Sequence, residues 1–157
     1  MHQAIKICVS GATGWTGSVV TKAILNSPHF QLVGALAQRH IGKDVGEVLG
    51  LEKCGILISN SLDDIGPCDV LIDYTKPHVV KSIAAAALNK KIKIVIGTSG
   101  LIDKDYEEID RLAKCHSLSA FAAGNFSVTA AIAKRLSLIA AAHLSSWEIL
   151  ITPVPEK

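Results

Sequence analysis

The sequence predicts an α/β fold built on a doubly wound parallel β-sheet. Short apolar segments alternate along the chain with longer segments whose apolar residues recur at helical spacing, a pattern typical of a parallel sheet covered by helices on both faces. The first apolar segment runs into a glycine-rich turn and then into a helical segment, which is how Rossmann-type folds begin. Hydrophobic residues make up 49% of the 157 residues and charged residues 19%, so one packed domain of this type is expected.

The first half of the chain contains four predicted strands. Residues 5–10 form an apolar run that ends at Gly11, as a buried parallel strand does. A helix is predicted over residues 14–26, because its apolar residues recur at helical spacing and Pro28 follows it. The glycine-rich segment 40–55 is predicted to be a long loop with room for one helical turn. The other strands of this half are predicted at residues 31–37, 56–58 and 70–74.

The second half continues the alternation. A helix is predicted to begin at Pro77, and its apolar face consists of Val80, Ile83, Ala84, Ala87 and Leu88. Helices are also expected over residues 103–116 and 127–143, with Asp103 and Ser127 as their N-caps. The remaining strands are predicted at residues 92–96, 119–123 and 147–151.

The charge balance does not fit a nucleic-acid-binding module. The chain has 16 Lys and Arg residues against 14 Asp and Glu, a net charge of +2, and the two signs are interspersed. Such a module would show a clustered basic stripe. Aromatic residues are only 4% of the chain, which leaves few rings for base stacking. No nucleic-acid partner is therefore expected.

Cysteine spacing and hydropathy indicate a cytoplasmic protein without a metal site. The cysteines Cys8, Cys54, Cys68 and Cys115 form no C-x-x-C pair, so neither a zinc site nor a disulfide scaffold is expected. The N-terminal residues lack the pattern of a signal peptide. The longest apolar helical stretch, residues 128–144, is interrupted by charged residues and is too short to span a bilayer. No membrane partner is expected either.

The glycine-rich turn after the first strand has the composition of a phosphate-binding loop. It consists of Gly11, Ala12, Thr13, Gly14, Trp15, Thr16 and Gly17. Glycine allows the backbone to turn tightly and to approach a diphosphate, whose charge the N–H groups at the helix start stabilise. A purely structural turn is the alternative interpretation, but the strand before it and the helix after it favour dinucleotide binding.

The end of the second strand favours NADPH over NADH as the cofactor. NAD-binding sites usually have an Asp or Glu there, which accepts hydrogen bonds from the ribose hydroxyls. In this chain Gln38, Arg39 and His40 occupy the position. A guanidinium binds a ribose 2′-phosphate, whereas a carboxylate repels it. The alternative is that Arg39 is only a solvated surface residue.

Three further segments follow predicted strands and combine small residues with hydroxyl, amide or aromatic groups. Open parallel sheets bind ligands beyond the carboxyl ends of their strands. Each segment alone is compatible with an ordinary strand-to-helix turn. Together with the glycine turn, however, they predict a crevice that contacts a nicotinamide or a small polar substrate. The segments are residues 73–77, 97–100 and 123–127.

In their order and spacing these motifs resemble the N-terminal domain of the dihydrodipicolinate reductase family. The resemblance covers nearly the whole chain and is carried by the glycine turn, Gln38-Arg39, Asp-Tyr-Thr-x-Pro at 73–77, Val-Ile-Gly-Thr-Ser-Gly at 95–100 and Asn-Phe-Ser at 125–127. It implies an NAD(P)H-binding domain followed by a smaller α+β domain for substrate binding and tetramerisation, which is expected to be absent from this chain. The implied reaction is hydride transfer to a cyclic, unsaturated dicarboxylate in lysine and diaminopimelate biosynthesis.

The resemblance also implies a role for each cofactor-binding residue. Residues 11–16 would hold the diphosphate, and Gln38 and Arg39 the adenosine ribose. Tyr74, Thr75, Gly97, Thr98 and Ser99 would lie along the cofactor towards the nicotinamide, and Ala123, Gly124, Asn125 and Phe126 would close over it. Ser99 stands where the family usually has Thr, and Trp15-Thr16 replaces the usual Arg-Met, so a charged contact near the diphosphate is not expected.

The C-terminal stretch departs from the family pattern. The family has a histidine pair there, the first of which is taken as the proton donor, followed by a lysine that acts in catalysis and on a substrate carboxylate. Lys157 falls on the lysine position, but Pro153 and Val154 occupy the histidine positions, and neither can deliver a proton. Lys157 is therefore the catalytic residue expected here. The dinucleotide-binding domain is expected over residues 1–146 and the crossover to the second domain over 147–157.

Two hypotheses about function remain open. The first is an NAD(P)H-dependent reductase of 4-hydroxy-tetrahydrodipicolinate, represented by its cofactor-binding part. The second is a non-catalytic dinucleotide-binding or regulatory homologue that has lost the histidine proton donor. Short-chain dehydrogenases fit less well, because they need Tyr-x-x-x-Lys, whereas Tyr74 and Tyr106 precede His78 and Asp110 at that spacing. A semialdehyde dehydrogenase needs a nucleophilic cysteine at a helix start, and the cysteines here sit elsewhere.

Overall fold

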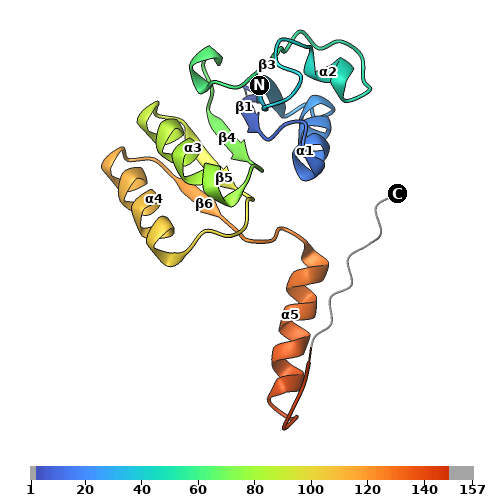
Figure 1. Cartoon of the computed structure of the whole chain (residues 1–157), viewed down its shortest axis with the longest axis vertical. Coiled ribbons are helices and arrows are strands. Elements are labelled where there is room, and N and C mark those ends of the chain that lie inside the picture. Colours follow the sequence, from blue (N-terminus) through green and yellow to red (C-terminus); the bar gives the residue numbers. More distant parts are fainter. Residues whose placement is uncertain (1–2, 149–157) are drawn as a thin grey trace. The chain divides into compact units, whose positions relative to one another are not determined.

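The computed structural model describes residues 3–148 and contains one six-stranded parallel sheet (Figure 1). Its strands are β1 (Ile5–Ser10), β2 (Phe30–Leu36), β3 (Ile58–Ser59), β4 (Val70–Asp73), β5 (Lys93–Ile96) and β6 (Ala120–Ala122). The helices are α1 (Trp15–Leu25), α2 (Val45–Val48), α3 (Pro77–Asn89), α4 (Asp103–Cys115) and α5 (Val128–Ala141), with a 3-10 turn at Leu62–Asp64. Strands and helices alternate along the chain, which confirms the predicted α/β fold.

The strand order is β3-β2-β1-β4-β5-β6, with every pair parallel. From β1 the chain builds outwards through β2 and β3, then returns to the other side of β1 and continues through β4, β5 and β6. This order is that of a doubly wound Rossmann-type sheet, and it reverses between β1 and β4. Ligands bind such sheets at the reversal, beyond the carboxyl ends of the two strands.

Two apolar clusters cover the two faces of the sheet. On one face Ile7 and Val9 of β1 pack with Ile24 of α1. On the other face Leu71 of β4 packs with buried residues of α3 and α4. Because β1 and β4 pack on both faces, their middle residues, 7–9 and 70–72, are apolar without alternation, as central parallel strands require. Burial of one Leu or Ile side chain contributes about 1.5–3 kcal/mol to folding, so these central strands hold the rim of the sheet in place.

The observed elements lie within two residues of the predicted ones at most boundaries. The 40–55 segment contains the helical turn α2, and Ser127 caps α5 by accepting a hydrogen bond from the Ala130 N–H at 3.3 Å. Asp103 is not an N-cap as predicted, because it is already the first residue of α4. The cap position is Ile102, whose N–H donates to the Asp105 carboxylate at 3.2 Å. The 3-10 turn at Leu62–Asp64 was not predicted.

The chain divides into two compact units, Met1–Gly124 and Asn125–Lys157. The first contains the whole sheet. The described part of the second is α5 with its flanking residues, and none of the α5 residues is buried. Trp147 and Glu148 are not in a strand, and the rest of the strand predicted at 147–151 lies outside the described residues. The domain boundary expected at residue 146 stays a prediction. Between residues 3 and 148 no helix has the length and apolar character needed to cross a membrane.

Candidate functional site

The candidate site lies along one edge of the sheet, where backbone hydrogen bonds connect the segments that follow the strands. The Gly11 N–H donates to the Leu36 carbonyl at 2.9 Å, and the Tyr74 N–H donates to the Ser10 carbonyl at 2.9 Å. The Gly97 N–H in turn donates to the Asp73 carbonyl at 2.9 Å. The carboxyl ends of β2, β1, β4 and β5 therefore lie side by side. Each is followed by one of the predicted site segments, namely 38–39, 11–17, 73–77 and 97–100.

The glycine turn can form only because two of its residues lack a side chain. Gly11 has a φ of 80°, and a Cβ there would overlap the carbonyl oxygen of Tyr74. A Cβ at Gly17 would overlap the carbonyl oxygen of Gly11. The turn therefore brings the start of α1 against the end of β1 and beside β4, as the sequence pattern predicts.

Thr21 fastens this turn from inside the protein and was missed by the sequence analysis. Its side chain is fully buried, and its hydroxyl donates to the Gly17 carbonyl at 2.8 Å, with the Ala12 carbonyl at 3.4 Å. The only signal in the sequence is a polar residue one turn after Gly17 on the inward face of α1. Thr21 supports the backbone of the turn and does not itself face a ligand.

The start of α1 fits an anionic group such as a diphosphate. Gly14, the N-cap, provides no side-chain hydrogen bond, and the first turn contains no acidic residue. The first N–H groups of a helix have no partner within the helix, and with the helix dipole they favour a negative charge. Trp15 and Thr16 are exposed, so the start of α1 lies at the protein surface.

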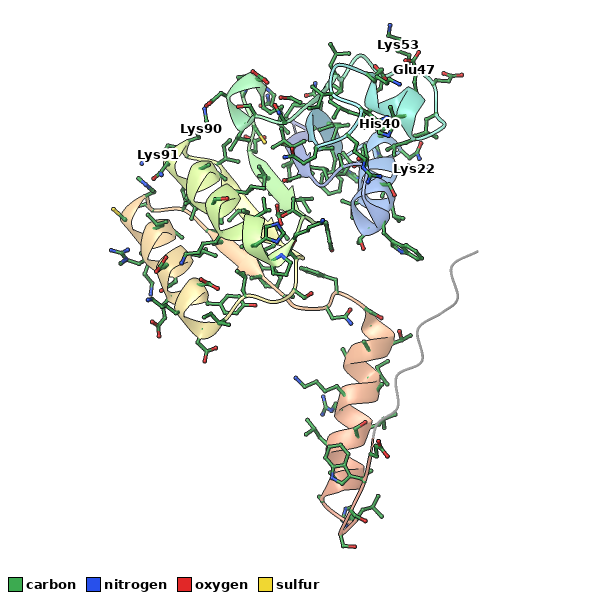
Figure 2. All side chains as sticks on the ribbon, in the orientation of Figure 1. Lys22, His40, Glu47, Lys53, Lys90 and Lys91 are labelled. Atoms are coloured by element: carbon green, nitrogen blue, oxygen red, sulfur yellow. The ribbon has the colours of Figure 1, made fainter. Side chains whose placement is uncertain are left out.

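Gln38, Arg39 and His40 form an exposed corner just beyond β2. His40, labelled in Figure 2, has a φ of 63°, and its carbonyl accepts a hydrogen bond from the Lys43 N–H at 3.0 Å. The corner leads into the loop that contains α2. Arg39 is therefore free to reach a ligand that lies across the end of β2.

Asp44 is the first acidic residue after β2, yet it faces its own loop. It is 2% exposed, and its carboxylate accepts backbone hydrogen bonds from Gly46 at 2.9 Å, Cys54 at 3.1 Å and Gly55 at 2.7 Å. Burial alone would raise the pKa of Asp44, but these hydrogen bonds outweigh it and hold the pKa below its usual value. Asp44 therefore does not supply the ribose-binding carboxylate of an NAD site.

Asp73, the first residue of the predicted segment 73–77, joins the ends of β4 and β5. Its carboxylate is fully buried and accepts a hydrogen bond from the Thr98 hydroxyl at 2.6 Å and from the Thr75 hydroxyl at 2.9 Å. The ring of Tyr74 lies against Gly97, where a Cβ would overlap it. These contacts join the segment after β4, with Tyr74 and Thr75, to the segment after β5, with Gly97 and Thr98. The sequence predicts only that the two segments are neighbours.

The predicted residues 123–126 are split between the two units. Ala123 and Gly124 end the first unit, where the Ala123 N–H donates to the Ile96 carbonyl at 3.1 Å. Asn125 and Phe126 belong to the second unit, and the Asn125 side chain accepts a hydrogen bond from the Ser127 N–H at 2.7 Å. That the four residues close over the nicotinamide stays a prediction.

The predicted catalytic position and the two positions of the family's histidines stay predictions. Lys157, Pro153 and Val154 lie outside the described residues. Within residues 3–148, no group of His, Cys, Asp and Glu side chains is arranged to hold a metal ion. His116 is in a structural contact, with Nδ1 at 2.7 Å from the Lys91 amine and Nε2 at 3.0 Å from the Asn89 side-chain oxygen.

A cavity of about 570 Å³ lies at the opposite end of the strands. It is lined by residues at the amino ends of β1, β4 and β5, including Lys6, Cys68 and Ile92, and by Lys90, which follows α3 (Figure 2). Cys68 is half-buried, and burial raises the pKa of its thiol, so it is not a reactive thiolate. This cavity shares no residue with the glycine turn and is separate from the candidate site.

Comparisons with known proteins agree with this geometry. The family model described as "Dihydrodipicolinate reductase, N-terminus" matches residues 5–126. A 4-hydroxy-tetrahydrodipicolinate reductase of Desulfitobacterium hafniense is 35% identical over 150 residues, which are 93% of this chain and 56% of that protein. The corresponding protein of Bacillus velezensis is 30% identical over 155 residues, covering 95% of this chain and 57% of that protein. The chain thus spans about half the length of the curated relatives it matches.

Two solved structures have a similar fold. A dipicolinate-bound dihydrodipicolinate reductase from Paenisporosarcina sp. TG-14 superimposes with a TM-score of 0.71 and 26% identity, covering 90% of this chain and 55% of that one. GenD2 from gentamicin A biosynthesis, in complex with NAD, has a TM-score of 0.66 at 18% identity over 80% of this chain and 36% of that one, a likeness in fold alone.

Proposed function

The chain belongs to the dihydrodipicolinate reductase family, and on this basis we propose that it binds a nicotinamide dinucleotide along the carboxyl ends of β2, β1, β4 and β5. The observation that carries the proposal is the uncapped start of α1 directly behind the glycine turn. An anion there meets unpaired N–H groups and the positive end of the helix dipole. Predicted site segments flank the turn on both sides, because β2 with Arg39 lies on one side of β1 and β4 with Thr75 lies on the other.

In this proposal each half of the dinucleotide has its own residues. Residues 11–16 hold the diphosphate, next to Gly17, and Gln38 and Arg39 contact the adenosine ribose. Tyr74, Thr75, Gly97, Thr98 and Ser99 line the nicotinamide half. Ala123, Gly124, Asn125 and Phe126 close over its end. The bound dinucleotide supplies the hydride, and this chain binds and orients it.

We further propose that NADPH is preferred over NADH. Arg39 is exposed at the end of β2, and the nearest following carboxylate, Asp44, is buried in its own loop. A 2′-phosphate therefore meets a guanidinium and no opposing carboxylate at this corner.

For the whole protein we propose reduction of 4-hydroxy-tetrahydrodipicolinate, a cyclic dicarboxylate, in lysine biosynthesis in the cytoplasm. Lys157 is the residue of this chain that we assign to catalysis and to a substrate carboxylate. The tetramer known in the family is the expected assembly when a second domain is present. Pro153 and Val154, at the histidine positions of the family, support a second candidate, a dinucleotide-binding homologue without reductase activity.

Titration of the 157-residue chain with NADPH and NADH tests the proposal. Trp15 is 78% exposed at the start of α1, so energy transfer from Trp15 to a bound reduced nicotinamide gives the signal. The background variant Trp147→Phe removes the other tryptophan. We expect Arg39→Ala to weaken NADPH binding about tenfold to a hundredfold, the equivalent of a charged hydrogen bond, and to leave NADH binding unchanged. Arg111→Ala, an exposed arginine on α4, is the matched control and should change neither.

An assay with the product of dihydrodipicolinate synthase then separates the two candidates. Oxidation of NADPH supports the reductase. Tight NADPH binding without turnover supports the non-catalytic homologue. If neither dinucleotide binds to the folded chain, both candidates are wrong.

A further inference from the structure

Asp73 occupies an unusual position for a carboxylate, because it is fully buried at the ligand-binding edge of the sheet. Within the described chain, the hydrogen bonds of its carboxylate all come from donor groups of Thr75 and Thr98. The Thr98 hydroxyl lies 2.6 Å from Oδ1, and the Thr75 hydroxyl lies 2.9 Å from Oδ1 and 3.1 Å from Oδ2. The Thr75 N–H is 3.2 Å from Oδ1.

These contacts determine the direction in which the two hydroxyl groups point. An ionised carboxylate accepts hydrogen bonds and cannot donate one. Thr75 and Thr98 each have one hydroxyl proton, and in both cases Asp73 is the acceptor of that proton. Each hydroxyl oxygen keeps its lone pairs and can then only accept a further hydrogen bond.

Only Thr75 is placed to use that capacity with a ligand. Thr98 is 7% exposed, whereas Thr75 is partly exposed on the segment that follows β4. β4 lies next to β1 and its glycine turn, on the side away from β2 and Arg39. A dinucleotide with its diphosphate at the turn and its adenosine at Arg39 has its nicotinamide nucleoside on the Thr75 side.

We propose that Asp73 is a positioning residue that makes the Thr75 hydroxyl a hydrogen-bond acceptor for the nicotinamide nucleoside of the dinucleotide. This inference rests on the proposed function. The ligand group that it selects is a donor, and the nicotinamide nucleoside has two: the carboxamide N–H₂ and the ribose hydroxyls. The hydrogen bond from Thr98 and the packing of the Tyr74 ring against Gly97 hold the side chains of Asp73 and Thr75 in this position.

The test measures binding of ADP, ADP-ribose and NAD⁺ to the full chain by calorimetry. This series extends the ligand stepwise towards the nicotinamide and lacks the 2′-phosphate, so Arg39 affects all three members alike. Asp73→Asn keeps the shape of the side chain but exchanges an acceptor oxygen for a donor N–H₂, which turns a threonine proton outwards. Thr75→Val removes the hydroxyl, and Thr75→Ser keeps it. Circular dichroism checks that each variant is folded.

We expect Asp73→Asn and Thr75→Val to weaken NAD⁺ binding about tenfold, the loss of one hydrogen bond, and to change ADP binding less than about twofold. Thr75→Ser should bind NAD⁺ within about threefold of the unmodified chain. Loss that already appears with ADP-ribose assigns the donor to the ribose, and loss that appears only with NAD⁺ assigns it to the carboxamide. Either pattern supports the proposal.

Two results would overturn the inference while leaving the proposed function intact. If Asp73→Asn weakens ADP and NAD⁺ binding equally, Asp73 has only a structural role. If Thr75→Val binds NAD⁺ as the unmodified chain does, the hydroxyl does not contact the ligand. If Asp73→Asn fails to fold, Thr98→Val takes its place, because it removes the other hydroxyl bound to Asp73 and should weaken NAD⁺ binding less than Thr75→Val does. If the unmodified, folded chain binds NADPH but none of these three ligands, the inference fails and the proposed function stands. If it binds neither NADPH nor any of the three, both are overturned.

Discussion

Gly17 is the residue on which the backbone of the glycine turn depends most directly. It is buried in the first turn of α1, and its missing side chain leaves the space that the Gly11 carbonyl occupies. Thr21 bonds to the Gly17 carbonyl and so depends on the same arrangement. The N–H groups that we assign to the diphosphate are those of the same helical turn. A change at this one residue therefore affects both folding and binding.

We expect Gly17→Ala to lower the free energy of unfolding by about 1–3 kcal/mol, because the added methyl group must displace backbone atoms. The same shift moves the start of α1, so NADPH binding should also weaken. Denaturant unfolding and the NADPH titration measure the two effects. Gly66→Ala is the matched control, because nothing lies within 4 Å of the added Cβ, and it should cost no stability. Equal stability of the two variants would contradict the role assigned to Gly17.

At the scale of elements, the short helix α2 and its long loop are organised around one buried carboxylate. Asp44 is the N-cap of α2 and also binds the backbone of Cys54 and Gly55, so it joins the two ends of the loop. The ion pairs between α3 and α4 are not buried as Asp44 is. Lys81 of α3 bridges Asp105 at 3.1 Å and Glu108 at 2.7 Å, both of α4, on a partly exposed surface. Those side chains are screened by water and contribute little.

Acid should therefore destabilise the loop through Asp44. Its pKa in the folded protein is lower than in the unfolded chain, so the stabilisation is complete above the unfolded value near 3.8 and is lost as the pH falls through the lower, folded value. We expect stability to decline below about pH 4 and less steeply in Asp44→Asn. Urea midpoints between pH 7 and pH 3 measure this. Asp103→Asn, an exposed position at the start of α4, controls for the change in net charge. Parallel pH profiles of Asp44→Asn and the unmodified chain would contradict the expectation.

At the scale of the whole molecule, the two units differ in how they bury apolar surface. The first unit has a cluster of buried residues on each face of its sheet. In the second, several apolar residues of α5 are more than half exposed, namely Val128, Ile132, Leu136, Leu138 and Ile139. Every residue of the glycine turn and of the β4 and β5 ends belongs to the first unit. Dinucleotide binding should therefore stabilise the sheet-containing unit.

We expect NADPH at one hundred times its dissociation constant to raise the free energy of unfolding of the sheet by about 2.7 kcal/mol. The gain follows from mass action, because the unfolded chain has no assembled rim to bind the ligand. Thermal unfolding followed by circular dichroism, with and without NADPH, measures it. Arg39→Ala should show a smaller shift at the same ligand concentration. An unchanged transition in saturating NADPH would contradict binding to the folded state.

Much of the fold follows from local pattern. The apolar runs of β1, β4 and β5 and the helical spacing in α1, α3 and α4 were enough to predict a parallel sheet, because central parallel strands must be apolar on both faces. The motifs at the strand ends likewise predicted which segments meet at the rim. The N-cap of α4 was assigned to Asp103 instead of Ile102, because the local sequence offers Asp103 and Asp105 in one turn. Only the backbone geometry distinguishes a capping residue from the first residue of the helix.

The sequence by itself thus determined the order of the strands and helices, the glycine turn and the membership in a reductase family. The tertiary structure alone decided which polar side chains serve the site: Asp44 turns into its own loop, Thr21 fastens the turn, and Asp73 joins Thr75 to Thr98. The physical reason is range. Periodicity and turn chemistry act between neighbouring residues, whereas the hydrogen bond between Asp73 and Thr98 links residues 25 positions apart and exists only when β4 and β5 pair in register.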